Sequence, residues 1–107
     1  MAYKIEYTND AAKDRADCVD YLFAKVGGTG NPIVARKFII ELERIENILS
    51  SNAEGHPLCE HPKLRKKGYR KIHLRHYKYK VVYYIENDTV FIVAVLHDLR
   101  DYENLLA

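Results

Sequence analysis

Apolar and polar positions follow two different periods along the first half of the chain. Residues 3–8 alternate between apolar and polar side chains, as a half-buried strand does. Apolar residues then recur at steps of three and four through residues 12–26 and 35–49, which is the period of a helix. The stripes are Ala12, Ala16, Val19, Phe23 and Val26, and then Ala35, Phe38, Leu42, Ile45 and Leu49. The pattern therefore predicts one strand followed by two helices.

Residues suited to helix ends bracket both stripes. The Thr-Asn-Asp sequence at residues 8–10 offers N-caps for the first helix, and the glycine-rich residues 27–30 end it. Asn31 and Pro32 start the second helix, which we expect to end near residues 52–55. The GGTG segment follows a helix and lacks an adjoining Lys-Ser/Thr pair, so it indicates a turn rather than a phosphate-binding loop. Two helices joined by so short a connection are expected to form an antiparallel hairpin.

The second half of the chain has the period of strands. Alternation indicates a strand near residues 71–75 and another at 77–84, followed by a turn at 86–89. Residues 90–96 are apolar throughout, which is typical of a central strand buried on both faces. The order β-α-α-β-β-β predicts an α+β domain. We expect its helical hairpin to pack on one face of a four-stranded, mostly antiparallel sheet.

The strand near residues 71–75 carries a basic face. Ile72 and Leu74 share one side and are expected to face the core, while Lys71, His73 and Arg75 point the other way. Because the two helices cover only one face of the sheet, we expect the opposite face to be an open, positively charged surface.

Charge is distributed very unevenly along the chain. The formal net charge is only +2, but residues 61–80 hold nine Lys or Arg and no acidic residue. The other residues hold eight Lys or Arg against fifteen Asp or Glu. Such asymmetry creates a local positive field that attracts phosphates or an acidic partner.

Composition excludes several classes of protein. With 107 residues, 48% of them hydrophobic and 30% charged, the chain fits a single globular domain spanning residues 1–107. Its two cysteines, Cys18 and Cys59, are too few for a disulfide framework and are expected to be reduced thiols. We find no signal peptide and no apolar run long enough to span a membrane, and we expect a cytoplasmic protein.

A metal and a cofactor are not expected. His56, Cys59 and His61 form an H-x2-C-x-H pattern, but a fourth ligand at zinc-site spacing is absent. No other motif for a cofactor is present in the sequence.

The order of elements, the run GYRKIHLRHYKYKVVYYIENDTVFIVAV and the following LHDLRDY together resemble the RelE/ParE superfamily of type II toxin–antitoxin modules. The resemblance covers nearly the whole chain and is most specific in residues 69–102. It implies a growth-inhibiting toxin, of the kind associated with plasmid stabilization, that is neutralised by a cognate antitoxin protein. RelE-like members are ribosome-dependent mRNA endoribonucleases, whereas ParE-like members poison DNA gyrase.

In the ribonuclease interpretation, the resemblance assigns catalytic roles to basic residues on the open face. Its alternating basic strand falls on Lys71, His73 and Arg75, of which the first two are the catalytic candidates. Its next basic position falls on Lys80 and its last near His97, with Tyr102 as the C-terminal tyrosine. RNA cleavage needs a base, an acid and cations beside the phosphate. We expect Lys80 and His97 to reach the same area as Lys71 and His73.

In the ParE-like interpretation, the same basic surface contacts a partner instead. The long hairpin and the ending Leu-His-x-x-Arg-Asp favour this interpretation, and Asp98 stands where the ribonuclease pattern has an arginine. The expected nucleic-acid or partner-binding residues are Lys63, Arg65, Lys66, Lys67, Arg70, Arg75, Lys78 and Arg100. We favour the ParE-like gyrase poison, with the RelE-like ribonuclease as the alternative. A nucleic-acid-binding module that keeps only the basic sheet is a third possibility.

Overall fold

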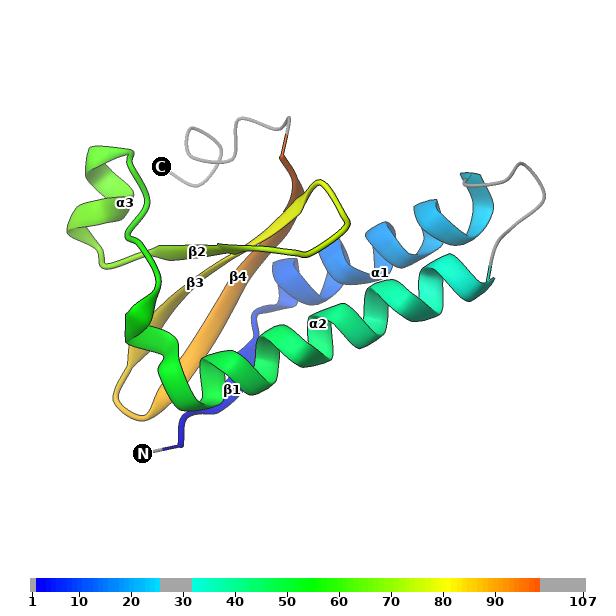
Figure 1. Ribbon diagram of the computed structural model, residues 1–107. Coiled ribbons are helices and arrows are strands. Elements are labelled where there is room, and N and C mark those ends of the chain that lie inside the picture. The colour runs from blue at the N-terminus through cyan, green and yellow to red at the C-terminus, as the bar shows by residue number, and fades with distance from the viewer. Residues whose placement is uncertain (1, 26–31, 99–107) are drawn as a thin grey trace.

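The computed structural model describes residues 2–25 and 32–98 (Figure 1). The elements, in chain order, are β1 (Lys4–Tyr7), α1 (Asn9–Lys25), α2 (Pro32–Asn52), the short 3-10 helix η1 (Ala53–Gly55), α3 (Pro62–Lys66), β2 (Arg70–His73), β3 (Tyr79–Glu86) and β4 (Thr89–His97). The predicted order β-α-α-β-β-β is confirmed. The sequence pattern did not predict η1 and α3. None of the described helices is long and apolar enough to cross a membrane.

The four strands form one mixed sheet in the order β1-β4-β3-β2. β1 runs parallel to β4, while β3 is antiparallel to both β4 and β2. The apolar strand β4 is therefore central, as predicted, and the expected α+β class with a mostly antiparallel sheet is confirmed.

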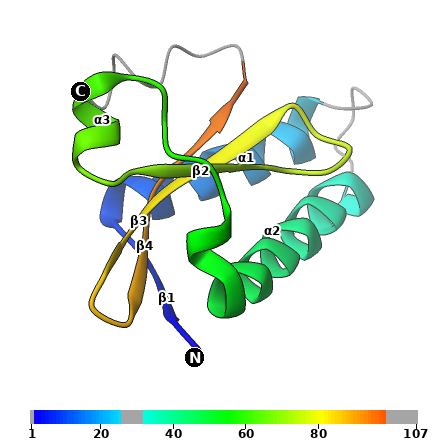
Figure 2. The ribbon, with the colours of Figure 1, turned by 60° about the vertical axis from the view of Figure 1, so that its left-hand side comes forward.

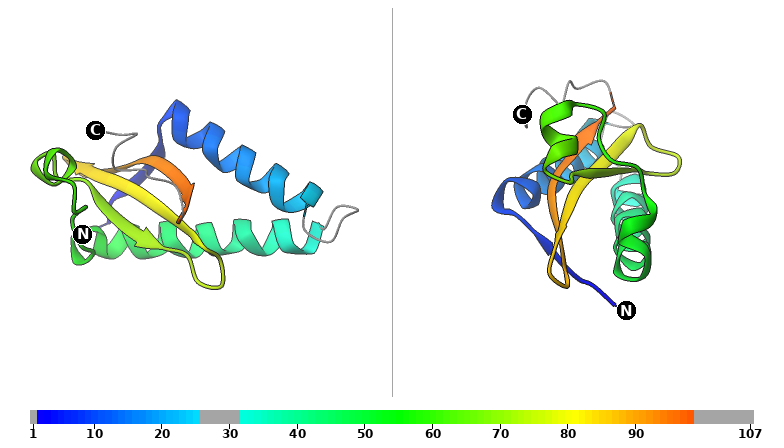
Figure 3. Two further views of the ribbon diagram at one scale, coloured as in Figure 1. Left: turned by 90° about the horizontal axis from the view of Figure 1, so that it is seen from above. Right: turned by 90° about the vertical axis from the view of Figure 1, so that its left-hand side faces the viewer.

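The two long helices lie side by side as an antiparallel hairpin that extends beyond the sheet (Figure 1 and Figure 3, left). The Thr8 side-chain oxygen accepts a hydrogen bond from the Ala11 N–H at 3.2 Å and so caps α1. α2 begins at Pro32, where proline fits the first helical turn. Val26, the glycine-rich segment and Asn31 lie outside the described residues.

The hairpin buries its apolar residues against one face of the sheet. All five residues of the predicted α2 stripe are buried. In α1 the predicted stripe is only partly right. Val19 packs against the core, but Ala12, Ala16 and Phe23 are exposed, and Ala11 and Leu22 are buried instead. α1 therefore turns a neighbouring side of its surface to the sheet, and part of its apolar stripe faces outward.

A bulge divides the apolar residues of β4 between the two faces of the sheet. Val82 pairs with Ala94 and Tyr83 pairs with Ile92, so Val93 is an extra residue without a partner in β3. An extra residue reverses the alternation of side chains beyond it. The uninterrupted apolar run of β4 accordingly contributes to the clusters on both faces.

α1 takes the place of a strand beside the second half of β4. β1 ends at Tyr7, opposite Ile92, and leaves the Val95 peptide group without a strand neighbour on that edge. The Asp14 carboxylate accepts a hydrogen bond from the Val95 N–H at 3.2 Å, and the Cys18 thiol donates to the Val95 carbonyl at 3.7 Å. These bonds fix the position of α1 along the strand.

The second face of the sheet is partly covered, so the expected open surface is wrong. Cys59 and Leu64 are fully buried and form a second cluster with Val82, Ala94 and Leu96. α3 and the segment before it thus lie over the strands on the side away from the hairpin core (Figure 2). The basic residues of this region therefore lie on α3, which covers part of this face, and around the edge of the covered area.

Candidate functional site

The basic strand β2 places Lys71 and His73 on the second face of the sheet, as the alternation predicted. In the register of β2 with β3, Lys71 lies opposite Val82 and His73 lies opposite Lys80. Val82 belongs to the second apolar cluster, which fixes the side of the sheet on which these residues lie. His73 is exposed and Lys71 is half-buried. The expected association of Lys71, His73 and Lys80 on one face is therefore present.

Lys80 is buried and engaged, with 5% of its surface exposed. Its Nζ donates a hydrogen bond to the Asp98 backbone oxygen at 3.1 Å. The Asp98 carboxylate in turn lies 3.3 Å from His73 Nδ1, a close contact that lacks the geometry of a hydrogen bond. A carboxylate in this group opposes the binding of a phosphate, because like charges repel at close range.

His97 lies on the other face of the sheet. It pairs with Tyr79 across β3 and β4, and the two rings meet edge to face with centroids 5.2 Å apart. His97 lines a pocket of about 320 Å³ together with Cys18 and Tyr21 of α1. Tyr79 belongs to the core beneath the hairpin. The expected convergence of His97 with Lys80 is therefore wrong, because the end of β4 points this ring toward α1.

Two predicted site residues cannot be placed. Arg100 and Tyr102 lie outside the described residues, so their assigned roles stay predictions.

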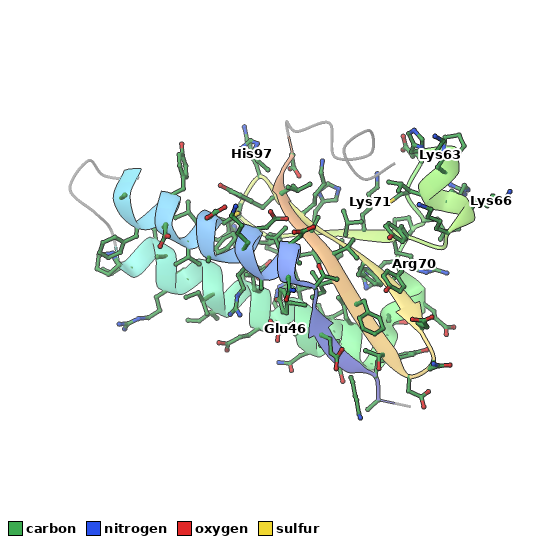
Figure 4. All side chains as sticks on the ribbon, turned by 180° about the vertical axis from the view of Figure 1, so that it is seen from behind. Glu46, Lys63, Lys66, Arg70, Lys71 and His97 are labelled. Atoms are coloured by element: carbon green, nitrogen blue, oxygen red, sulfur yellow. The ribbon has the colours of Figure 1, made fainter. Side chains whose placement is uncertain are left out.

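The densest group of cations lies on and beside α3. Lys63, Arg65, Lys66 and Lys67 are all exposed, while Leu64 between them is fully buried. The His61 Nδ1 atom accepts a hydrogen bond from the Lys63 N–H at 3.2 Å and caps this short helix. Figure 4 shows Lys63 and Lys66 projecting from α3, well separated from His97. We call these four residues the α3 basic cluster.

The remaining predicted binding residues lie at the start of β2 and in the connection that follows it. The Arg70 Nη1 donates to the His56 carbonyl at 2.6 Å, so this guanidinium ties β2 to the preceding segment. Arg75 and Lys78 are exposed in the connection between β2 and β3. The Arg75 backbone N–H donates to the carboxylate of Glu41 in α2, a buried acid that the sequence pattern did not single out.

The residues of the H-x2-C-x-H pattern have separate structural roles. Cys59 is buried in the second cluster and His61 caps α3. Burial, with a smaller contribution from the Arg70 charge, lowers the pKa of His56. Within residues 2–25 and 32–98, no group of three His, Cys, Asp or Glu side chains is arranged to hold a metal ion. Both cysteines are free thiols.

The fold is shared with solved toxin structures. One is described as the chromosomal ParDE TA system from P. aeruginosa, with 17% identity and a TM-score of 0.70 over 90% of this chain and 96% of that chain. Another is a doubly substituted E. coli toxin RelE in the free state, with 18% identity and a TM-score of 0.63 over 98% and 93% of the two chains. The isolated E. coli RelE toxin matches with 20% identity and a TM-score of 0.56, over 98% and 96%. At these identities the likeness establishes the fold alone.

Family membership follows from the sequence. A helical hairpin packed on one face of a four-stranded mixed sheet is the fold that this chain shares with those ParDE and RelE toxin structures. The model of the family described as "ParE toxin of type II toxin-antitoxin system, parDE" matches residues 5–102. The chain belongs to this family and is the toxin of a type II toxin–antitoxin system. No curated protein sequence matches it.

Proposed function

We propose that this toxin acts by binding and poisoning DNA gyrase, in the manner of ParE-like toxins, and that a cognate antitoxin neutralises it. The observation that carries the proposal is the division of the expected catalytic groups between two faces of the sheet. Lys71, His73 and Lys80 lie on the second face, whereas His97 packs against Tyr79 beneath the hairpin. General acid–base cleavage needs both proton-transfer groups within reach of one phosphate.

The state of Lys80 supports the same conclusion. A lysine that stabilises a phosphate must present its ammonium group to the substrate. Here the ammonium group is buried and donates to the Asp98 carbonyl. The neighbouring Asp98 carboxylate adds negative charge where the substrate phosphate would lie.

The hairpin supports action through a protein partner. The exposed large apolar residues among the described residues all lie on α1 and α2, and they are Tyr21, Phe23, Ile33 and Ile40. Exposed aromatic and aliphatic side chains typically anchor protein interfaces. We assign contact with gyrase to the exposed face of α2 that carries Ile33 and Ile40, seven residues apart, and call it the apolar hairpin surface.

One observation favours the alternative, an mRNA endoribonuclease. Lys71 and His73 do share a face, and the Asp98 carboxylate beside the His73 ring resembles the orienting partner of a general base. This arrangement makes His73 the residue whose substitution separates the two mechanisms.

Two assays on the same proteins decide between the mechanisms. Purified toxin is added to gyrase and supercoiled plasmid, and transcript ends are mapped after induction in cells. We expect cleaved plasmid trapped with gyrase, intact transcripts, and unchanged growth inhibition by His73→Ala. Lys13→Ala, on the exposed side of α1, is the control for effects of substitution and purification that do not depend on the candidate site. Codon-linked transcript cuts that disappear in His73→Ala would overturn the proposal in favour of the ribonuclease.

A further inference from the structure

The α3 basic cluster consists of exposed cations held on a rigid support. Lys63, Arg65, Lys66 and Lys67 point away from the sheet because Leu64 is fully buried among Cys59 and the strands. Backbone bonds hold the end of the helix, since the Tyr69 N–H donates to the Leu64 carbonyl at 3.0 Å and the Gly68 N–H to the Arg65 carbonyl at 3.0 Å.

These four cations have no acidic partner within the described part of the chain. Their charged groups form no ion pair and no hydrogen bond with residues 2–25 or 32–98. The nearest acid along the chain is Glu60, and no other acid follows before residue 80. Like charges within a turn or two of each other repel and raise the free energy of the fold. An anionic ligand removes this repulsion, so the cluster is suited to one.

The surroundings of the cluster favour nucleic acid over an acidic protein. The exposed large apolar residues of the described chain are confined to the hairpin, and none lies on or beside α3. Protein interfaces depend on such apolar anchors, whereas the DNA backbone is bound mainly by charge.

We propose that the α3 basic cluster binds the phosphate backbone of duplex DNA, independently of base sequence. The inference rests on the proposed function, because gyrase presents duplex DNA to a bound toxin. The cluster consists of Lys and Arg, which neutralise backbone phosphates, and contacts to phosphate carry no sequence information directly. The toxin therefore has two contact surfaces, an apolar hairpin for the protein and a basic helix for the DNA that the protein holds.

The test measures DNA binding by the full-length toxin without gyrase. Fluorescence anisotropy of a labelled duplex of about 20 base pairs is recorded over a range of salt concentrations. Binding should weaken with salt, because each neutralised phosphate contributes about −0.9 to the log–log slope. The double variant K63Q/K66Q should reduce the magnitude of the slope by about two. K63R/K66R, which keeps both charges, should retain the wild-type slope.

A charge-matched control separates the cluster from the overall field of the protein. K4Q/K13Q also removes two exposed cations, but from β1 and α1, with β1 at the opposite edge of the sheet from β2. It should leave the slope within experimental error of wild type. The inference is overturned if the two glutamine variants weaken binding equally, or if the toxin does not bind duplex DNA at low salt. Tighter binding to single-stranded RNA of equal length would overturn the assignment to DNA.

The outcome is distinguishable from failure of the proposed function. If wild-type toxin binds duplex DNA through α3 but does not trap cleaved plasmid with gyrase, the gyrase proposal fails and the DNA contact stands. If the toxin traps cleaved plasmid but K63Q/K66Q retains the wild-type salt slope, the DNA contact fails and the gyrase proposal stands.

Discussion

A single carboxylate in α2 fixes the connection between β2 and β3. Glu41 is 9% exposed, and its two oxygens accept hydrogen bonds from the Arg44 guanidinium at 2.6 and 2.7 Å. It also accepts the Arg75 backbone N–H. The hydrogen bond from Arg44 lowers the pKa of Glu41, against the opposing effect of burial, and the bond from Arg75 lowers it further.

Substitution of Glu41 should destabilise the fold in a pH-dependent way. Glu41→Gln loses the charge-assisted bonds to Arg44 and should lower the free energy of unfolding by about 2 kcal/mol at neutral pH. A depressed folded-state pKa contributes stability above the unfolded-state pKa of about 4.3, and this contribution is lost as the pH falls through the folded-state value. The difference between wild type and variant should therefore shrink below about pH 4 in urea unfolding experiments.

Glu43 provides the matched control for this prediction. It lies on the exposed side of the same helix and makes no ion pair with a described residue. Glu43→Gln should change stability by less than about 0.5 kcal/mol at any pH. An equal loss in both variants would mean that the net charge, rather than the contacts of Glu41, determines the effect.

Single residues were predictable from the sequence only where local alternation determines their direction. The faces of Lys71, His73 and Ile72 follow from the period of the strand, and the structure agrees. The burial of Lys80 was missed, because its acceptor is the Asp98 carbonyl, eighteen residues further along the chain. The partners of Glu41 were missed for the same reason, since no local pattern marks a contact made across the fold.

At the scale of elements, α3 is the feature that reshapes the site. Its five residues are too few to show a helical period, so the sequence pattern did not predict it. The same limit applies to β4, where an uninterrupted apolar run hides the bulge at Val93. Part of the buried face of α1 was assigned wrongly because small residues such as Ala12 and Ala16 fit either a buried or an exposed position.

Removing the anchor of α3 should loosen this element before the rest of the fold. Leu64→Ala leaves a cavity in the small second cluster and should cost about 2–4 kcal/mol of local stability. The amides of Cys59 and Tyr69, which bond to the Tyr69 and Leu64 carbonyls, should then exchange hydrogen faster than those of β4. Hydrogen exchange detected by NMR measures this difference.

Leu42→Ala in the main core is the comparison. Leu42 packs from α2 into the main core against the sheet, so its truncation should accelerate exchange throughout the sheet. If Leu64→Ala also accelerates hydrogen exchange uniformly across the sheet, residues 56–69 do not form a separately stabilised unit, and the prediction fails.

At the scale of the whole molecule, apolar and basic contact surfaces are segregated. The exposed apolar residues lie on the hairpin, while the α3 basic cluster lies on the short helix that partly covers the second face. The concentration of charge was evident from the sequence, but its separation from the exposed apolar residues was not. The sequence pattern did not show which face of α1 is exposed or that α3 is present, because both depend on packing in three dimensions.

This segregation predicts that the two surfaces can be disabled separately. Ile33 and Ile40 lie seven residues apart on one face of α2 and are 65% and 57% exposed, so I33S/I40S should leave the folded state intact. We expect this variant to lose gyrase binding in a pull-down while retaining the wild-type salt slope for duplex DNA. K63Q/K66Q should behave in the opposite way, because it removes charge from α3 and leaves the apolar hairpin surface unchanged. Loss of both activities in either variant, with an unaltered circular dichroism spectrum, would contradict two independent surfaces and indicate one continuous interface.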